Sequence, residues 1–206
     1  MDGPLPTHYE PHESPFDNLL YGQRSNPTRQ LFDRPENPYN PVDGDAYPYV
    51  FTTYRLTEHH TAGGMSRTVR YLSELQPELF VEVSPELAEE RGLEHGGWAT
   101  VITARTAIEA RVMVTDRMPA LRVDGRTVHQ VGLPYHWGHH GISTGDPAND
   151  LFPLALDPNV HIQEVKAATC DVRAGRRPRG RELLELVESY RRRAGVQVAG
   201  REVVSR

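Results

Sequence analysis

Residues 49–60, YVFTTYRLTEHH, decide the fold of this chain. The first half of the stretch is rich in β-branched and aromatic side chains, which favour a strand that packs one face into a core. The second half is dense in charged and hydrogen-bonding side chains, which must emerge at the strand end because unpaired charges cannot stay buried. A strand that delivers arginine, threonine and histidine to one rim is suited to an anionic ligand. An ordinary strand that runs into a polar loop is the alternative, and this stretch alone does not separate the two.

Residues 47–172, which surround this stretch, predict a domain of many short strands with few helices. Beyond the strand at residues 49–54, strands are expected at residues 79–83, 98–103, 108–114, 128–133 and 167–172. An Asp-Gly pair at residues 124–125 lies between strand-like flanks and indicates a hairpin turn. Many short strands with one or two helices favour a closed barrel.

Two short helices are expected within this domain. Residues 66–75 form the first helical stretch. The second has a clear start signal, because Ser84 can cap it, Pro85 fits the first turn and Glu86 meets the positive end of the helix dipole. Gly92 supplies the left-handed residue that commonly ends a helix.

The segment of residues 1–46 is rich in proline, asparagine, aspartate and tyrosine. Proline at this density is expected to prevent helices and sheet ladders. Aromatic and leucine side chains are interleaved with the prolines, whereas disordered tails are usually poor in aromatics. We therefore expect an extended arm that lies on a surface, either of this chain or of another chain or domain.

Composition changes again in residues 173–206. A basic break, RRPR at residues 176–179, precedes a stretch at residues 182–193 with apolar side chains at helical spacing. This stretch predicts an amphipathic helix that packs on the barrel or on a partner. A membrane-surface helix is disfavoured, because the stretch is short and carries several glutamates.

The composition and net charge of the chain exclude several classes of protein. A mean hydropathy of -0.59 and the lack of a run of about 18 apolar residues exclude a transmembrane helix. A net charge of -5 argues against nucleic acid as the main partner. The start of the chain shows no signal peptide, so the sequence leaves the compartment open between cytoplasmic and exported as part of a complex. The single cysteine, Cys170, excludes an internal disulfide or a cysteine-ligated cluster, so any redox centre must come from elsewhere.

Three further polar positions accompany the stretch at residues 49–60. Residues 135–141, YHWGHHG, follow a predicted strand, and their glycines allow the backbone to approach a ligand closely. Asn149 lies in a loop of glycine, proline and aspartate, and Lys166 precedes the last predicted strand. Each is weak evidence alone, since an asparagine in such a loop more often serves turn chemistry.

Neither a metal site nor a catalytic nucleophile is predicted. The pairs His59-His60 and His139-His140 could each give only one ligand to a common site, because neighbours on a strand point to opposite faces. Their spacing matches no compact zinc signature. Cys170 lies in an apolar strand, where a buried inert thiol is the default. The sequence also lacks a Gly-x-Ser-x-Gly elbow and a glycine-rich phosphate loop.

Three stretches together resemble one known family. They are GPLPTHYEPHESP at residues 3–15, TTYRLTEH at residues 52–59 and GLPYHWG at residues 132–138. They are similar to the carboxy-terminal dinucleotide-binding domain of molybdopterin-dependent oxidoreductases, above all of the large (alpha or major) subunit of formate dehydrogenases of the respiratory type. Residues 148–151 and Lys166 add support, and the likeness covers residues 2–172.

The resemblance implies a fold and a set of binding residues. The fold is a double-psi β-barrel, the aspartate decarboxylase-like barrel, here with short helices, the extended proline-rich arm and the C-terminal helix. The cofactor is a bis-molybdopterin guanine dinucleotide that carries molybdenum or tungsten. By position in the motifs, the implied cofactor-binding residues are Thr53, Arg55, Leu56, His59, His60, Thr61, Tyr135, His136, Trp137, Asn149 and Lys166.

The resemblance also implies an incomplete catalyst. In the family, the metal-ligating cysteine or selenocysteine and the iron–sulfur cysteines lie in upstream domains, which this chain lacks. Formate oxidation to CO2 would therefore need the upstream catalytic and iron–sulfur portion as a partner, with further electron-transfer subunits. Whether the chain is a gene fragment or a separate subunit stays open, as do the metal and the substrate.

Two departures from the family pattern concern loops. Trp98 follows Gly97 where the family commonly has aspartate, and Thr106 follows Arg105 where it has glycine. The alternative function is a free-standing barrel that docks other proteins as an adaptor and binds no cofactor. A self-processing decarboxylase on a related barrel is excluded, because it needs a Gly-Ser pair that this sequence does not contain.

Overall fold

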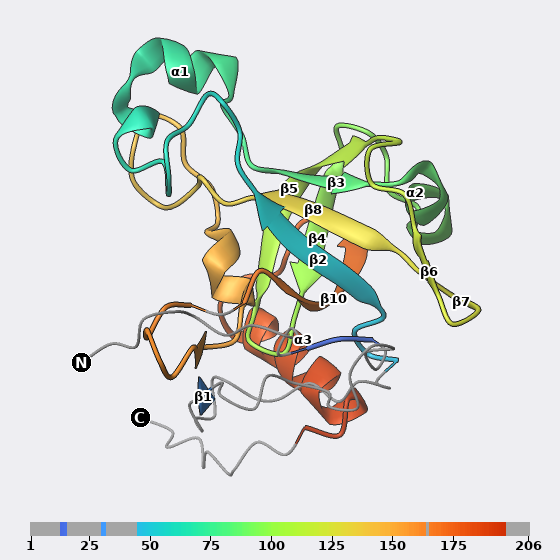
Figure 1. Ribbon diagram of the computed structural model, residues 1–206. Coiled ribbons are helices and arrows are strands. Elements are labelled where there is room, and N and C mark those ends of the chain that lie inside the picture. Colours follow the sequence, from blue (N-terminus) through green and yellow to red (C-terminus); the bar gives the residue numbers. More distant parts are fainter. Residues whose placement is uncertain (1–12, 16–29, 32–44, 164, 197–206) are drawn as a thin grey trace.

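A closed barrel of six strands forms the centre of the molecule. The computed structural model describes residues 13–15, 30–31, 45–163 and 165–196 (Figure 1). The strand order around the barrel is β10-β2-β8-β3-β5-β4. The bounds of these strands are β2 (Tyr49–Tyr54), β3 (Phe80–Val83), β4 (Trp98–Ile102), β5 (Ala107–Val114), β8 (Gln130–Pro134) and β10 (Ala167–Ala174). The predicted mainly-β fold with a closed barrel is confirmed.

The barrel mixes parallel and antiparallel pairs. β2 runs parallel to β8, and β3 runs parallel to β5. The other neighbours, including β3 with β8 and β4 with β5, are antiparallel. Parallel neighbours need crossover connections, so each parallel pair joins strands that are distant in sequence. A six-stranded closed barrel with this mixed pairing is consistent with the predicted double-psi architecture.

Apolar side chains from all sides of the barrel fill its interior. Phe51, Val81, Val101, Leu133 and Val172 are fully buried in one cluster. They come from five different strands, which explains why the predicted strands read as apolar runs in the sequence. Their burial supplies the main driving force for closing the barrel.

The two predicted helices are present, with one difference. α2 (Pro85–Arg91) begins at Ser84, whose side chain accepts a hydrogen bond from Leu87 N, and ends at Gly92 with a φ of +61°. The stretch predicted as one helix is divided into η1 (Ser66–Thr68) and α1 (Arg70–Leu75). Val69 separates them in an extended conformation, which β-branched residues favour.

The Asp-Gly turn also forms as predicted. β6 (Leu121–Val123) and β7 (Arg126–Val128) pair antiparallel around Asp124 and Gly125. Both turn residues have positive φ, at +49° and +71°, as a type I′ turn requires. The strand predicted at residues 128–133 is therefore divided, since β8 begins two residues after β7 ends.

The described part of the N-terminal arm lies on this chain's own barrel. The carboxylate of Glu13 is fully buried, pairs with Arg105 and accepts hydrogen bonds from Thr169 N at 3.0 Å and Thr169 Oγ1 at 3.1 Å. β1 (Gln30–Leu31) pairs antiparallel with β9 (Ala155–Leu156). The expectation that proline density prevents any ladder in the arm is therefore wrong for these two residues, where the local sequence contains no proline.

The C-terminal extension packs on the barrel, one of the two arrangements expected for it. α3 (Gly180–Arg193) crosses the end of the barrel opposite α1 (Figure 1). Val187 and Tyr190 are buried against Tyr47 and Ile102. The helix starts two residues before the predicted stretch, and β10 continues past residue 172 to pair with β4. The division into segments at residues 46 and 172 stays a prediction.

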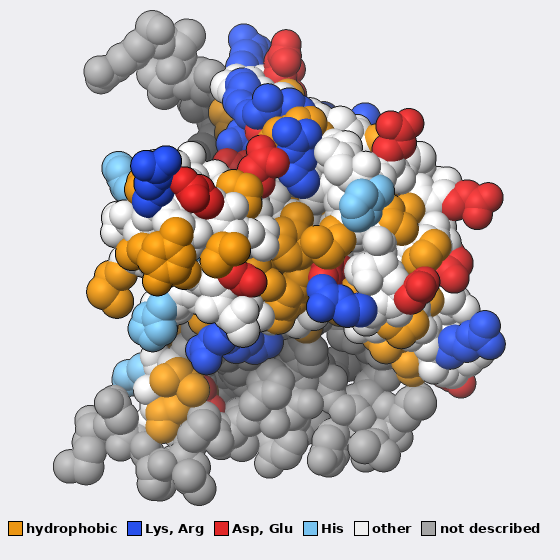
Figure 2. Space-filling model, turned by 90° about the horizontal axis from the view of Figure 1, so that it is seen from above, with side chains coloured by type: hydrophobic (Ala, Val, Ile, Leu, Met, Phe, Trp, Pro, Cys, Tyr) orange, Lys and Arg blue, Asp and Glu red, His pale blue; other side chains and the backbone are white. Residues whose placement is uncertain are grey.

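Exposed apolar side chains concentrate around η1 and α1. Met65, Tyr71, Leu75 and Ile142 are each more than 60% exposed. Figure 2 shows hydrophobic side chains gathered on the face that includes α1.

No helix in the described part of the chain is long and apolar enough to span a membrane. Cys170 is fully buried, as predicted, and this burial raises the pKa of its thiol.

Candidate ligand-binding site

Two pockets open where β2 and β8 end. We name the first the barrel-mouth pocket; its volume is about 440 Å³. It brings together four of the predicted binding residues, Thr53, Tyr135, Asn149 and Lys166. They come from the end of β2, the residue after β8, the 3-10 helix η2 (Ala148–Leu151) and the segment before β10.

We name the second the loop pocket; its volume is about 410 Å³. It lies along the polar half of the stretch at residues 49–60 and reaches Ser66 and Leu72. Five more predicted residues line it, namely Arg55, Leu56, His59, His60 and Thr61. Both pockets fall within the range of volumes typical of small-molecule sites.

The parallel pairing of β2 with β8 explains why these residues meet. Thr53 is opposite Leu133, and Tyr54 is opposite Pro134. The pairing continues with a hydrogen bond from Tyr135 N to Tyr54 O at 3.3 Å. Both strands therefore end at the same edge of the barrel, and the polar residues that follow them lie side by side.

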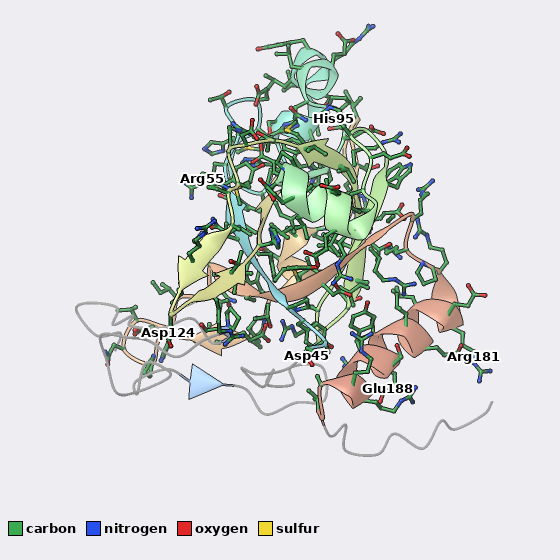
Figure 3. The ribbon with its side chains drawn as sticks, turned by 90° about the vertical axis from the view of Figure 1, so that its right-hand side faces the viewer. Asp45, Arg55, His95, Asp124, Arg181 and Glu188 are labelled. Atoms are coloured by element: carbon green, nitrogen blue, oxygen red, sulfur yellow. The ribbon has the colours of Figure 1, made fainter. Side chains whose placement is uncertain are left out.

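Tyr135 lies close to two cations. Arg55 Nε donates to Tyr135 Oη at 2.7 Å, and the Arg55 guanidinium lies 5.8 Å from the ring centroid. Lys166 Nζ lies 5.7 Å from the same centroid. Neither cation forms an ion pair within the described residues, and both are exposed. Figure 3 shows Arg55 at the edge of the fold. We call Arg55 and Lys166 the rim cations.

His136 is fully buried and uses both ring nitrogens within the chain. Its Nε2 accepts a hydrogen bond from Leu56 N at 2.7 Å, so the proton is on Nδ1, which donates to Thr61 O. Burial lowers the pKa of His136 and favours this neutral form. The imidazole therefore fixes the loop of residues 56–61 to the end of β8. That it also contacts a ligand stays a prediction.

His59 has an equivalent arrangement. Its ring is buried, with Nδ1 3.2 Å from Ser66 Oγ and Nε2 3.0 Å from Gln76 O. Because a carbonyl oxygen only accepts, Nε2 carries the proton and Nδ1 accepts from the serine hydroxyl. His59 thus holds the loop pocket to the start of η1. It lines the pocket with its ring, while its nitrogens are engaged.

Trp137 lies in the core rather than in either pocket. Its ring is 3% exposed and meets the His59 ring edge-on at a centroid distance of 5.2 Å. Its indole Nε1 has no hydrogen-bond partner among the residues that the structure describes. A Cβ atom on Gly145 would lie 2.9 Å from Trp137 Cδ1, so this glycine permits the packing. The predicted contact of Trp137 with a ligand stays untested.

The end of the loop pocket is a strained turn. Thr61 has a φ of +47°, which is rare for a β-branched residue and costs about 1–3 kcal/mol. Its carbonyl is held by His136, and a Cβ atom on Gly63 would lie 2.0 Å from His136 O. The surrounding contacts thus fix the turn, and strain of this kind is typical of ligand sites. His60 and Thr61 are the exposed side chains of the turn.

Sequence reasoning missed several residues near these pockets. Phe152 and Gln163 line the barrel-mouth pocket from a segment without a polar cluster, so no local signal marked them. Arg67 is 5% exposed, and its backbone N–H donates to Gly63 O at 2.9 Å, two residues after the strained Thr61. The described residues include no group of three or more histidine, cysteine, aspartate or glutamate side chains that could hold a metal ion.

This chain is similar to several known proteins. The family model of the Molydopterin dinucleotide binding domain matches residues 49–169. Formate dehydrogenase 2 subunit alpha (cytochrome c-553) of Nitratidesulfovibrio vulgaris is 42% identical over 174 residues, which cover 84% of this chain and 17% of that protein. Formate dehydrogenase subunit alpha of Megalodesulfovibrio gigas is 38% identical over 177 residues, covering 83% and 17%. Formate dehydrogenase-O major subunit of Escherichia coli is 36% identical over 174 residues, also covering 83% and 17%. The chain spans less than a fifth of the length of these relatives.

Proposed function

The chain belongs to the molybdopterin dinucleotide-binding domain family, and from this we propose that its two pockets hold the guanine dinucleotide part of a molybdenum or tungsten cofactor. The rim cations carry the proposal. Arg55 lines the loop pocket and Lys166 lines the barrel-mouth pocket, and their charges lie 5.8 Å and 5.7 Å from the centroid of the same tyrosine ring. Neither has a carboxylate partner among the described residues. Two positive charges without a counter-charge match the pyrophosphate of a dinucleotide.

The other side chains of the barrel-mouth pocket fit the rest of such a ligand. The Tyr135 ring offers an apolar face, and the Asn149 amide offers both a donor and an acceptor. Guanine presents donors and acceptors on one edge, which an amide can match. The Thr53 hydroxyl can donate to a phosphate oxygen. A ring face, an amide and a hydroxyl are together the kinds of group that can bind a guanine dinucleotide.

The loop pocket supplies a pre-organised wall. The ring nitrogens of His59 and His136 are engaged within the chain, so the two rings hold the loop rather than offer donors. The exposed side chains of His60 and Thr61 remain to contact phosphate or the pterin ring. Such rigid support makes binding tighter, because less conformational entropy is lost.

In an assembled enzyme, we propose formate oxidation to CO2 with this chain as the cofactor-holding portion. The bound cofactor would supply the metal centre, whereas the protein supplies binding, orientation and electrostatics. Cys170 is the only cysteine of the chain and is buried, so it offers no ligand to a metal or an iron–sulfur cluster. The partner is therefore a catalytic portion that carries these ligands, with electron-transfer subunits beyond it.

Composition of the assembled complex tests this proposal. The chain would be expressed with the cysteine-rich catalytic portion in cells that make the cofactor, and the purified complex analysed for nucleotide and metal. We expect guanine nucleotide together with molybdenum or tungsten, formate oxidation by the complex, and none by the isolated chain. A complex that assembles without nucleotide would contradict the proposal and favour the protein-docking alternative.

A further inference from the structure

Arg67 is a buried cation that contacts only neutral groups among the described residues. Its side chain is 5% exposed, and burial lowers its pKa. The terminal nitrogen Nη1 donates to Gly138 O at 3.1 Å, to Ser143 O at 3.3 Å and to His140 O. The three carbonyls belong to a single loop, residues 138–143. Burying a charge in this way is costly unless hydrogen bonds compensate it, so the contacts indicate a specific role.

The backbone of Arg67 binds the same loop from the other side. Ile142 N donates to Arg67 O at 2.8 Å, and Ser73 Oγ donates to that oxygen at 3.0 Å. Ser143 Oγ in turn lies 3.2 Å from Ser73 Oγ. The loop is therefore attached to both the guanidinium and the carbonyl of one residue.

Three glycines make room for Arg67. A Cβ atom on Gly141 would lie 2.9 Å from Arg67 Cβ, and one on Gly138 would lie 3.1 Å from Nη2. A Cβ atom on Gly63 would lie 3.0 Å from Arg67 Nε. The close approach of two backbone segments, at residues 63 and 138–141, to the Arg67 side chain thus depends on residues without side chains.

These contacts join two of the segments that carry predicted binding residues. Ser66, directly before Arg67, binds the His59 ring at the end of the loop pocket. Gly138, whose carbonyl Arg67 binds, lies two residues after His136. We propose that Arg67 is a positioning residue, which holds the strained turn and the loop of residues 138–143 in the arrangement that the cofactor requires. The proposal rests on the proposed function.

The hydrogen bonds predict which substitutions the site tolerates. All three carbonyl contacts of the Arg67 guanidinium come from Nη1. Its Nε has no hydrogen-bond partner among the described residues. A lysine ammonium has three donors and can satisfy the same carbonyls. Methionine has a similar length but no donor, so it leaves the carbonyls buried and unpaired.

Titration of the 206-residue chain with GDP tests the proposal. For Arg67→Met, we expect an affinity at least tenfold lower than that of the wild type, and for Arg67→Lys within threefold of it. The matched control is Arg70→Met, which removes an exposed arginine paired with Glu74 and should leave the affinity unchanged. Hydrogen exchange at the Ile142 amide should accelerate in Arg67→Met and not in the control. GDP affinity of folded Arg67→Met within twofold of the wild type would overturn the proposal.

A milder variant covers the case in which Arg67→Met does not fold. Ser73→Ala removes the side-chain link to Arg67 O and should lower GDP affinity about threefold while the fold is kept; an unchanged affinity would overturn the proposal. If the wild type itself does not bind GDP, the proposed function fails. Exchange at Ile142 then decides the positioning role, because exchange that is unaltered in Ser73→Ala, which loses a contact to Arg67 O, would exclude it.

Discussion

Cations at two regions of this barrel differ in how they are paired. At the barrel mouth, the rim cations Arg55 and Lys166 face a tyrosine ring and have no carboxylate partner among the described residues. Elsewhere on the barrel, seven arginines each bind a carboxylate of another segment. We call these the latch arginines, and they are Arg91, Arg105, Arg111, Arg117, Arg176, Arg177 and Arg179.

The difference separates stability from binding. Each latch arginine joins segments that are distant in sequence, such as Arg105 with Glu13 or Arg177 with Asp146. Their charges are neutralised within the chain, so they are not available to a ligand. The rim cations contribute little to the fold, since exposed charges without a partner rarely do, and they remain available to an anion from outside.

Breaking the most buried latch should have the largest effect. Arg105→Met leaves the fully buried Glu13 carboxylate without its cation, and we expect a loss of about 3–5 kcal/mol in the free energy of unfolding. Urea unfolding at neutral pH measures it. The double variant Glu13→Gln with Arg105→Met should lose less, because no buried charge is left unpaired. A loss below about 1 kcal/mol in the single variant would remove the distinction between latch and rim.

Removing a rim cation should weaken ligand binding and leave the stability of the fold nearly unchanged, the opposite of breaking a latch. Arg55→Ala should weaken GDP binding at least tenfold, or about 1.4 kcal/mol, while the melting temperature stays within about 2 °C. Calorimetric titration and thermal unfolding measure the two quantities. Arg122→Ala on the β6 strand removes another exposed arginine and should change neither. A collapse of stability with unchanged affinity would make Arg55 structural.

Lowering the pH should weaken the latch that Glu109 forms with Arg176 and Arg179. Burial acts to raise the pKa of Glu109, but hydrogen bonds and charges from Arg179 and Arg176 outweigh it and lower the pKa to about 2. A carboxylate with a lowered folded pKa stabilises the fold above its ordinary value near 4.5, and this contribution is lost as the pH falls from there towards 2.

The variant Glu109→Gln isolates this contribution. Its melting temperature should be below that of the wild type at pH 7, and the gap should shrink at pH 3. A gap that stays constant from pH 7 to pH 3 would show that the ionised carboxylate of Glu109 does not stabilise the fold.

The smallest effect is expected from the tyrosine that lies close to both rim cations. Tyr135→Phe keeps the ring but removes the hydroxyl that accepts from Arg55 Nε. We expect a loss of about threefold in GDP affinity, in line with one hydrogen bond. Tyr71→Phe on the exposed face of α1 is the control and should have no effect. A loss as large as that of Arg55→Ala would show that the hydroxyl, rather than the cation, carries the binding.

Local patterns in the sequence predicted most of the barrel. The apolar runs marked the barrel strands, Ser84 and Gly92 marked the ends of α2, and the Asp-Gly pair marked its hairpin. These features depend on near neighbours in the chain, so their sequence signals are local. The resemblance to the family predicted eleven binding residues, and nine of them line the two pockets.

What the sequence did not show depends on distant partners. The buried pair of Glu13 and Arg105 joins residues 92 positions apart, and no local pattern marks either one. Arg67 likewise meets its carbonyls more than 70 positions away. The engagement of His136 with Leu56 and Thr61 is also visible only in three dimensions. The sequence predicted His136 as a binding residue, whereas only the geometry distinguishes its support of the loop from contact with a ligand.

Comparison of GDP with guanosine as ligands of the 206-residue chain tests the central claim most directly. The two differ only in the anionic diphosphate, which the unpaired rim cations are proposed to bind. We predict that GDP binds at least tenfold more tightly than guanosine and that the double variant Arg55→Ala with Lys166→Ala abolishes the difference. Equal affinity for both ligands, or a GDP preference that survives in the double variant, would contradict the account.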